Sequence, residues 1–162
     1  MLPMEKLHIK KEEELQTVAT RVLELLIKQK DINGISVLAL SGDLGAGKTS
    51  FMKVLAHAIG VVEEVTSPTF VVMNHYEIES DTGAQKTEFF AHLYHLDAYR
   101  IEEQDEMRVI HFDEILKTEH ALVCIEWAER IKELLPAHTM FMDIALDGQS
   151  ETERTITLSY GS

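Results

Sequence analysis

The chain has 162 residues, of which 45% are apolar, and its net charge is −13, from 28 acidic against 15 basic side chains. This length suits one domain with one core, and the acidic excess argues against direct, tight binding of nucleic acid. Cys124 is the single cysteine, which excludes an intramolecular disulfide, and no apolar run approaches the ~20 residues of a membrane helix, so we expect a cytoplasmic protein.

The first half of the chain predicts helices that alternate with a strand. Apolar side chains recur on one helical face over Glu12–Lys30, which indicates an amphipathic helix. The apolar, β-branched run Ile35–Leu40 predicts a buried strand. A second helix is expected over Lys48–Ile59, ended by Gly60. A glycine-rich stretch therefore lies between a strand and a helix.

The second half predicts strands with two short helical segments. A strand at Phe70–Tyr76 and another within "TEFFAHLYHLD" (87–97) suggest a hairpin across the turn "ESDTGAQ" (79–85). An acidic surface helix at 101–110, a turn at 112–117, a buried strand at 121–127, a short helix at 128–135 and a closing pair of strands at 140–148 and 154–160 follow. Together these elements indicate an α/β fold with a central, mostly parallel sheet, antiparallel additions and helices on both faces.

The glycine-rich stretch has the chemistry of a phosphate loop. Gly42, Gly47, Lys48 and Thr49 match the pattern G-x-x-x-x-G-K-S/T without a gap. Glycines let backbone N–H groups form a nest for anions, and the following helix adds its positive N-terminal end. Lys48 can reach the β- and γ-phosphates, and the Thr49 hydroxyl can coordinate Mg²⁺. The strand–loop–helix context favours a P-loop NTPase domain over a glycine-rich turn that only caps a helix.

Motifs of other P-loop classes are missing from the sequence. It has no N-K-x-D motif for reading guanine and no L-S-G-G-Q signature of transporters. Between Gly42 and Leu146 the only arginines are Arg100, Arg108 and Arg130, fewer than the lid of a nucleoside kinase would be expected to supply. These observations favour an adenine nucleotide and hydrolysis.

Two acids could complete such a site. Asp97 ends "FFAHLYHLD" and Glu126 ends "ALVCIE", so both follow buried strands and emerge where α/β proteins bind ligands. Either could lie near Mg²⁺, and Glu126 could act as general base for the attacking water. For each acid, the pattern fits a surface carboxylate equally well.

The remaining candidates each allow two interpretations. His92 and His95 point to opposite faces of one predicted strand, which argues against a shared metal ion, whereas His95 and Asp97 share a face and could form a hydrogen bond. Trp127 fits core packing and purine stacking equally well. The segment "TSPTF" (66–70) suits a loop that senses the γ-phosphate or a bent connection before a strand.

Four blocks of sequence together resemble the TsaE (YjeE) family, small ATPases required for threonylcarbamoyladenosine formation in tRNA. The P-loop alone is shared by many families, but four blocks in this order and spacing are specific. The resemblance spans Glu12–Leu158 and rests on "GDLGAGKT" at 42–49, "SPTF" at 67–70, "HLDAYR" at 95–100 and "EWAER" at 126–130.

The resemblance implies roles for particular residues. Ser67–Thr69 resemble the family's switch loop, and Asp97 resembles its Walker-B-like acid. The implied catalytic residues are Lys48, Asp97 and Glu126, and the implied Mg²⁺ ligands are Thr49, Glu126 and Asp97. The implied nucleotide contacts are Leu44, Gly45, Ala46, Gly47, Lys48, Thr49, Ser50, Thr69 and Trp127. Two positions depart from the family pattern: Ala98, where Leu is frequent, and His111, near a usual Gly.

The resemblance also implies a function for residues 1–162 as a single P-loop ATPase domain. The expected cofactors are ATP and Mg²⁺, and the expected activity is slow alone and stimulated by the TsaD–TsaB complex, which hydrolysis resets between turnovers. Contact with tRNA is expected only through these partners, in keeping with the acidic charge, and no membrane contact is expected. The alternatives are a small-molecule P-loop kinase and a nucleotide-gated adaptor without useful hydrolysis.

Overall fold

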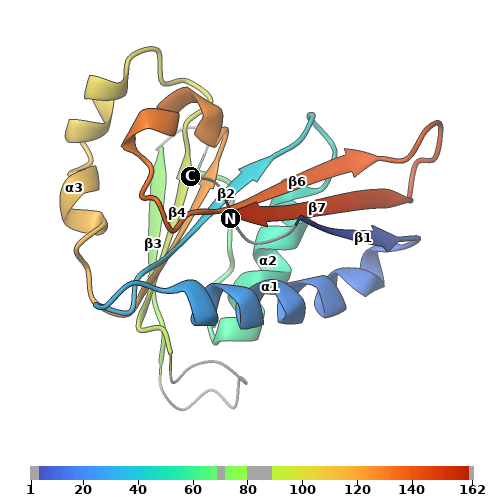
Figure 1. Cartoon of the computed structure of the whole chain (residues 1–162), viewed down its shortest axis with the longest axis horizontal. Coiled ribbons are helices and arrows are strands. Elements are labelled where there is room, and N and C mark those ends of the chain that lie inside the picture. Colours follow the sequence, from blue (N-terminus) through green and yellow to red (C-terminus); the bar gives the residue numbers. More distant parts are fainter. Residues whose placement is uncertain (1–3, 69–71, 80–88, 161–162) are drawn as a thin grey trace.

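A computed structural model describes residues 4–68, 72–79 and 89–160. Within these ranges seven strands form one sheet in the order β1-β7-β6-β2-β5-β4-β3 (Figure 1). The strands are β1 Glu5–Ile9, β2 Ser36–Ser41, β3 Met73–Glu77, β4 His92–Asp97, β5 Ala121–Glu126, β6 Met140–Leu146 and β7 Arg154–Tyr160. Strands β4, β5, β2 and β6 run parallel, while β3 joins one side and β7 and β1 the other in antiparallel fashion. The predicted α/β fold with a mostly parallel centre is therefore confirmed.

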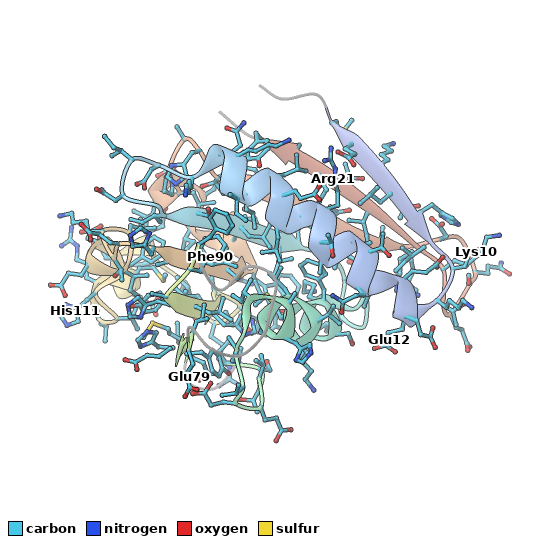
Figure 2. All side chains as sticks on the ribbon, turned by 90° about the horizontal axis from the view of Figure 1, so that it is seen from below. Lys10, Glu12, Arg21, Glu79, Phe90 and His111 are labelled. Atoms are coloured by element: carbon cyan, nitrogen blue, oxygen red, sulfur yellow. The ribbon has the colours of Figure 1, made fainter. Side chains whose placement is uncertain are left out.

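Helices cover both faces of this sheet. One face carries α1 (Leu15–Gln29), which a single 3₁₀ turn η1 (Glu12–Glu14) precedes, and α2 (Lys48–Ile59). Figure 2, seen from below, shows α1 and α2 next to each other in front of the strands. The other face carries the shorter segments η2 (Gln104–Arg108), α3 (Phe112–Ile115) and η3 (Ala128–Leu134).

The predicted helix over Lys48–Ile59 has the bounds of α2. It ends because Gly60 adopts a left-handed conformation, with φ at 102°, and its N–H donates to the carbonyls of Ala56 and His57. A glycine tolerates this conformation without the strain of a Cβ atom.

The sheet separates two hydrophobic clusters. Leu38 and Leu40 point to the cluster under α1 and α2, whereas Val37 and Ala39 point to the cluster under η2, α3 and η3. Both faces of β2 are covered, which explains why its sequence is a continuous apolar run. Cys124 lies wholly within the first cluster, as predicted, and burial raises the pKa of its thiol.

Some local predictions differ from the structure. The acidic segment 101–110 forms the 3₁₀ helix η2 rather than an α-helix, and the turn at 112–117 contains the one-turn helix α3. The segment predicted as a helix at 128–135 is also 3₁₀ and breaks at Ile131. The segments of η2 and η3 are too short for an α-helix to be stable by itself, so packing on the sheet decides their 3₁₀ form.

Strand β1 is an element that sequence reasoning missed. Its side chains alternate between half-buried and exposed along an edge of the sheet. The strand is short and has few apolar residues, so this alternation does not stand out in the sequence. The start of the predicted strand at Phe70 and most of the predicted turn at 79–85 lie outside the described residues. No helix in the described part of the chain is both long and apolar enough to cross a lipid bilayer.

Candidate functional site

The glycine loop connects the carboxyl end of β2 to the first residue of α2. Gly42, Gly45 and Gly47 all have positive φ, at 143°, 79° and 112°. At Gly42 an added Cβ atom would lie 2.5 Å from the carbonyl oxygen of Ile144 on β6. The loop therefore needs glycine at this position both for its conformation and for its close approach to a neighbouring strand.

A cavity of about 440 Å³ opens beside this loop. It gathers residues from the loop, from the start of α2, from the segment before β3 and from the ends of β4 and β5. Its lining comprises Leu44, Gly45, Gly47, Lys48, Thr49, Ser50, Ser67, Asp97, Tyr99, Glu126 and Trp127. Most of the predicted site residues thus meet in one place. Ala46 is buried on another side of the loop, and Thr69 lies outside the described residues.

The side chain of Lys48 contacts the backbone of the glycine loop. Its ammonium donates hydrogen bonds to the carbonyls of Gly42 and Asp43, the latter at 3.2 Å. The same ammonium lies 5.0 Å from the ring centroid of Trp127, within the range of a cation–π contact. A buried cation held by neutral carbonyls is available to an anion that enters the cavity.

Asp97 and Glu126 are paired in register at the ends of the parallel strands β4 and β5. Both are buried, and both line the cavity. The sheet therefore places two carboxylates side by side at the edge where the loop begins, because the register of these parallel strands aligns their carboxyl ends.

His95 holds one of these carboxylates. Its Nε2 lies 2.8 Å from Oε2 of Glu126, and the imidazole has no exposed surface. The hydrogen bond suggested between His95 and Asp97 is corrected by this geometry, because the longer Glu126 side chain reaches His95 from the next strand. An oxygen of Asp97 instead accepts a hydrogen bond of 2.9 Å from the backbone N–H of Tyr99, two residues further along the chain, as in an Asx turn.

Aromatic rings close the far wall of the cavity. Trp127 follows Glu126 in a left-handed conformation with φ at 57°, and its ring lies 5.0 Å from that of Tyr99, centroid to centroid. The guanidinium of Arg130 lies over the ring of Tyr99, 5.7 Å from its centroid, and donates a hydrogen bond to the carbonyl of Ile101. Tyr99 was not among the predicted site residues, although it belongs to the "HLDAYR" block.

A second, smaller cavity of about 180 Å³ lies against the loop. It shares Gly45, Gly47 and Ser50 with the first cavity. The rest of its lining comprises Ala46 of the loop itself and, from the β1–α1 region and the β6–β7 hairpin, Ile9, Glu12, Leu15, Ile144, Glu151, Thr152 and Arg154. Sequence reasoning missed all of these except Ala46, because only the sheet order brings β1 and β7 near the loop.

A buried strand, a glycine loop ending in Lys-Thr, a helix and two carboxylates on neighbouring parallel strands define a P-loop nucleotide-binding protein. Residues 9–156 match the sequence profile of the family described as "Threonylcarbamoyl adenosine biosynthesis protein TsaE". The chain belongs to the TsaE family.

Individual relatives agree with this membership. The TsaE protein of Bacillus subtilis is 38% identical over 121 residues, 75% of this chain and 68% of that protein. The Treponema pallidum TsaE protein is 35% identical over 121 residues, 75% of this chain and 81% of that one. The Nostoc protein is 38% identical, with the match covering 59% of this chain and 54% of the relative. All three are named tRNA threonylcarbamoyladenosine biosynthesis protein TsaE.

A solved structure has the same fold. The crystal structure of Bacillus subtilis YdiB superimposes with a TM-score of 0.67 and 28% sequence identity. The superposition covers 99% of this chain and 88% of that one.

The two departures from the family pattern lie outside the lining of the first cavity. Ala98 is buried in the cluster under η2 and α3, and its N–H donates to the carbonyl of Glu126 at 2.9 Å. His111 adopts a left-handed conformation with φ at 55° just before α3. Residues other than glycine adopt this conformation infrequently.

Proposed function

We propose that residues 1–162 act as one Mg²⁺-dependent ATPase domain in tRNA threonylcarbamoyladenosine biosynthesis, where hydrolysis resets a TsaD–TsaB complex between turnovers. The observation that carries the proposal is the single cavity lined by the P-loop and by both carboxylates. Family membership supports the pathway.

The loop residues fit the phosphates of ATP. Gly45 and Gly47 leave backbone N–H groups uncovered by side chains, and α2 directs its positive end at the same cavity. The Lys48 ammonium would exchange the carbonyls of Gly42 and Asp43 for phosphate oxygens, which form stronger, charge-assisted bonds.

The oxygen ligands of the cavity fit Mg²⁺. The Thr49 hydroxyl and the carboxylates of Asp97 and Glu126 are the hard donors that this ion prefers. When bound, Mg²⁺ would neutralise charge that develops on the phosphates. Held by His95, the carboxylate of Glu126 would keep one orientation toward the attacking water, and it would accept a proton from that water.

The second cavity suits the adenosine part of the nucleotide. Ile9, Leu15 and Ile144 give it apolar walls, and it borders the loop at Gly45 and Gly47. Trp127 lines only the first cavity, so we assign its ring to the phosphate end. Ser67 also lines the first cavity, in keeping with a switch segment at Ser67–Thr69.

The arginines of the chain favour stimulation by a partner. No arginine of the described ranges lines the first cavity. Arg130 is engaged by Tyr99 and Ile101, and Arg108 lies near Asp105 at the surface. Transition-state charge on the γ-phosphate would therefore be stabilised mainly by Lys48 and Mg²⁺, and a partner could supply a further cation.

The test is ATP hydrolysis by the full chain, measured with and without the TsaD–TsaB complex. We expect slow turnover alone, acceleration by the complex, and loss of both in the Lys48→Ala and Glu126→Gln variants. Fast turnover that the complex does not change would refute partner control. Transfer of phosphate to a metabolite would favour the kinase alternative, and tRNA modification that survives in Glu126→Gln would favour the adaptor.

A further inference from the structure

We propose that Arg154 is a positioning residue for the nucleotide site, because it holds the peptide between Ala46 and Gly47 in the orientation that presents the Gly47 N–H to phosphate. This inference rests on the proposed function and adds a role for a strand far from the P-loop in sequence.

The guanidinium of Arg154 joins the loop to the β6–β7 turn. Its Nε donates to the carbonyl oxygen of Ala46 at 2.8 Å, across 108 positions of sequence. One terminal nitrogen donates to the carbonyls of Glu151 and Glu153, at 3.0 Å and 3.3 Å. A planar guanidinium can bind all three carbonyls in one fixed geometry, which the rotating ammonium of a lysine cannot do.

Fixing one carbonyl also fixes the next N–H. In a trans peptide the carbonyl and the following N–H point in opposite directions, and no described peptide bond is cis. With the Ala46 oxygen directed at Arg154, the Gly47 N–H is directed away from it. Gly47 has φ at 112° and no side chain that could restrain the peptide, so the arginine supplies the restraint.

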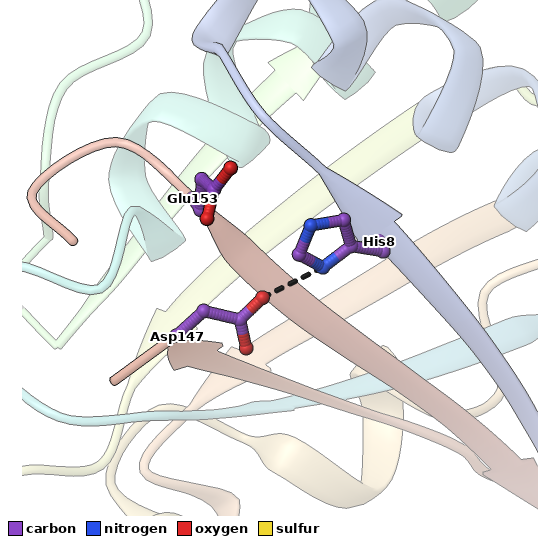
Figure 3. Close-up of side chains that lie close together, drawn as sticks. All are labelled: His8, Asp147 and Glu153. Carbon is purple, nitrogen blue, oxygen red and sulfur yellow. Dashed lines mark ion pairs between the residues drawn. The ribbon is translucent and has the colours of Figure 1, made fainter. Parts of the chain in front are cut away.

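The turn that presents Arg154 is itself braced. Asp147 accepts a hydrogen bond from Thr155 at 2.6 Å, and its N–H donates to the carbonyl of Glu153 at 3.0 Å. Figure 3 shows the imidazole of His8, on β1, directed at the other oxygen of Asp147, with the two atoms 2.6 Å apart. These contacts tie the turn to two strands, so Arg154 is anchored on a stable support.

Arg154 also lines the second cavity, and a direct contact with the adenosine part of ATP is the competing explanation. The two explanations differ in one respect. A residue that shapes the phosphate nest affects every ligand with the same phosphates, whereas a residue that contacts the nucleoside affects only ligands that contain it.

The experiment compares Mg-ATP with Mg-tripolyphosphate, which lacks the nucleoside, by titration calorimetry on the full chain. The variants are Arg154→Met, which keeps the apolar stem, and Arg154→Lys. Arg21→Met is the control, because Arg21 makes a comparable fork to Glu5 between α1 and β1. Figure 2 labels Arg21 near β1. Thermal unfolding is measured for each variant.

We expect Arg154→Met to weaken binding of both ligands by the same factor, about tenfold for one lost restraint on a charged-ligand contact. Arg154→Lys should recover part of this loss, and Arg21→Met should bind both ligands as the wild type does. Weakened ATP binding with unchanged tripolyphosphate binding would overturn the inference in favour of direct contact. Unchanged binding of both, or equal losses in Arg154→Met and Arg21→Met, would also overturn it.

The failure of the proposed function is distinguishable from the failure of this inference. If the wild-type chain binds neither ligand, the proposed function fails and the inference falls with it. If the wild type binds both and Arg154→Met does so equally well, only the positioning role fails. Should Arg154→Met not fold, the Arg154→Lys variant alone tests the inference. If that variant binds tripolyphosphate with wild-type affinity, the forked guanidinium is not needed to position the loop and the inference is overturned.

Discussion

The contact between His95 and Glu126 allows the catalytic role of a carboxylate to be separated from its structural role. Replacing His95 by Leu keeps much of the side-chain volume but removes the 2.8 Å hydrogen bond. A buried carboxylate then loses its partner, which costs about 1.5–3 kcal/mol in the free energy of unfolding. For a chain of this size each kcal/mol lowers the melting temperature by roughly 2–4 °C, so we expect a decrease of roughly 3–12 °C.

Two further variants make this prediction specific. In Glu126→Gln the amide can still bond the Nε2 of His95, so we expect a loss of stability below about 1 kcal/mol together with loss of hydrolysis. His92 lies on the same strand and bonds His75 at the exposed surface, so His92→Leu should change stability by only about 0.5 kcal/mol.

The assays are thermal and urea unfolding followed by circular dichroism, together with ATP hydrolysis in the presence of the partner complex. We expect His95→Leu to lower hydrolysis by roughly 10–100-fold, because the carboxylate that it orients would become mobile. If His95→Leu costs no more stability than His92→Leu, or if it retains full hydrolysis, the positioning of Glu126 by His95 is refuted.

Three more predictions concern the loop, a buried phenol and the thiol. Gly42→Ala should lower the free energy of unfolding by about 3 kcal/mol or more, because the added Cβ atom meets the Ile144 carbonyl. Gly45→Ala has open space around the added atom and should lower it by about 1 kcal/mol. Equal losses of stability in urea unfolding would contradict this reasoning. Burial raises the pKa of Tyr160 to about 12, and since the unfolded pKa is about 10, the stabilisation is present below pH 10 and is lost as the pH rises toward 12. Tyr160→Phe should therefore lose less stability than the wild type between roughly pH 9 and pH 11, by urea midpoints, and an equal loss would count against the raised pKa. Cys124 has no exposed surface and a raised pKa, so a thiol reagent should label it only in urea; rapid labelling of the native chain would show that the first cluster opens.

Features that depend on neighbouring residues could be predicted from the sequence. The phosphate loop at 42–49 follows from glycine, lysine and threonine at fixed spacing, and α2 was predicted with its observed bounds because a glycine ends it. The buried strands β2 and β5 were visible as continuous apolar runs, since helices cover both of their faces. The residue pattern alone left Asp97 and Glu126 as either site or surface acids, and the family resemblance favoured the site.

Sheet order and register were decided only by the tertiary structure. They place Asp97 beside Glu126, let His95 bond the second of these rather than the first, and carry Arg154 to the carbonyl of Ala46. They also recruit β1, whose alternating pattern was too short to stand out. The physical reason is that such contacts join residues far apart in the sequence, with 108 positions between Ala46 and Arg154. Their geometry depends on how whole strands pack, which local spacing in a sequence does not record.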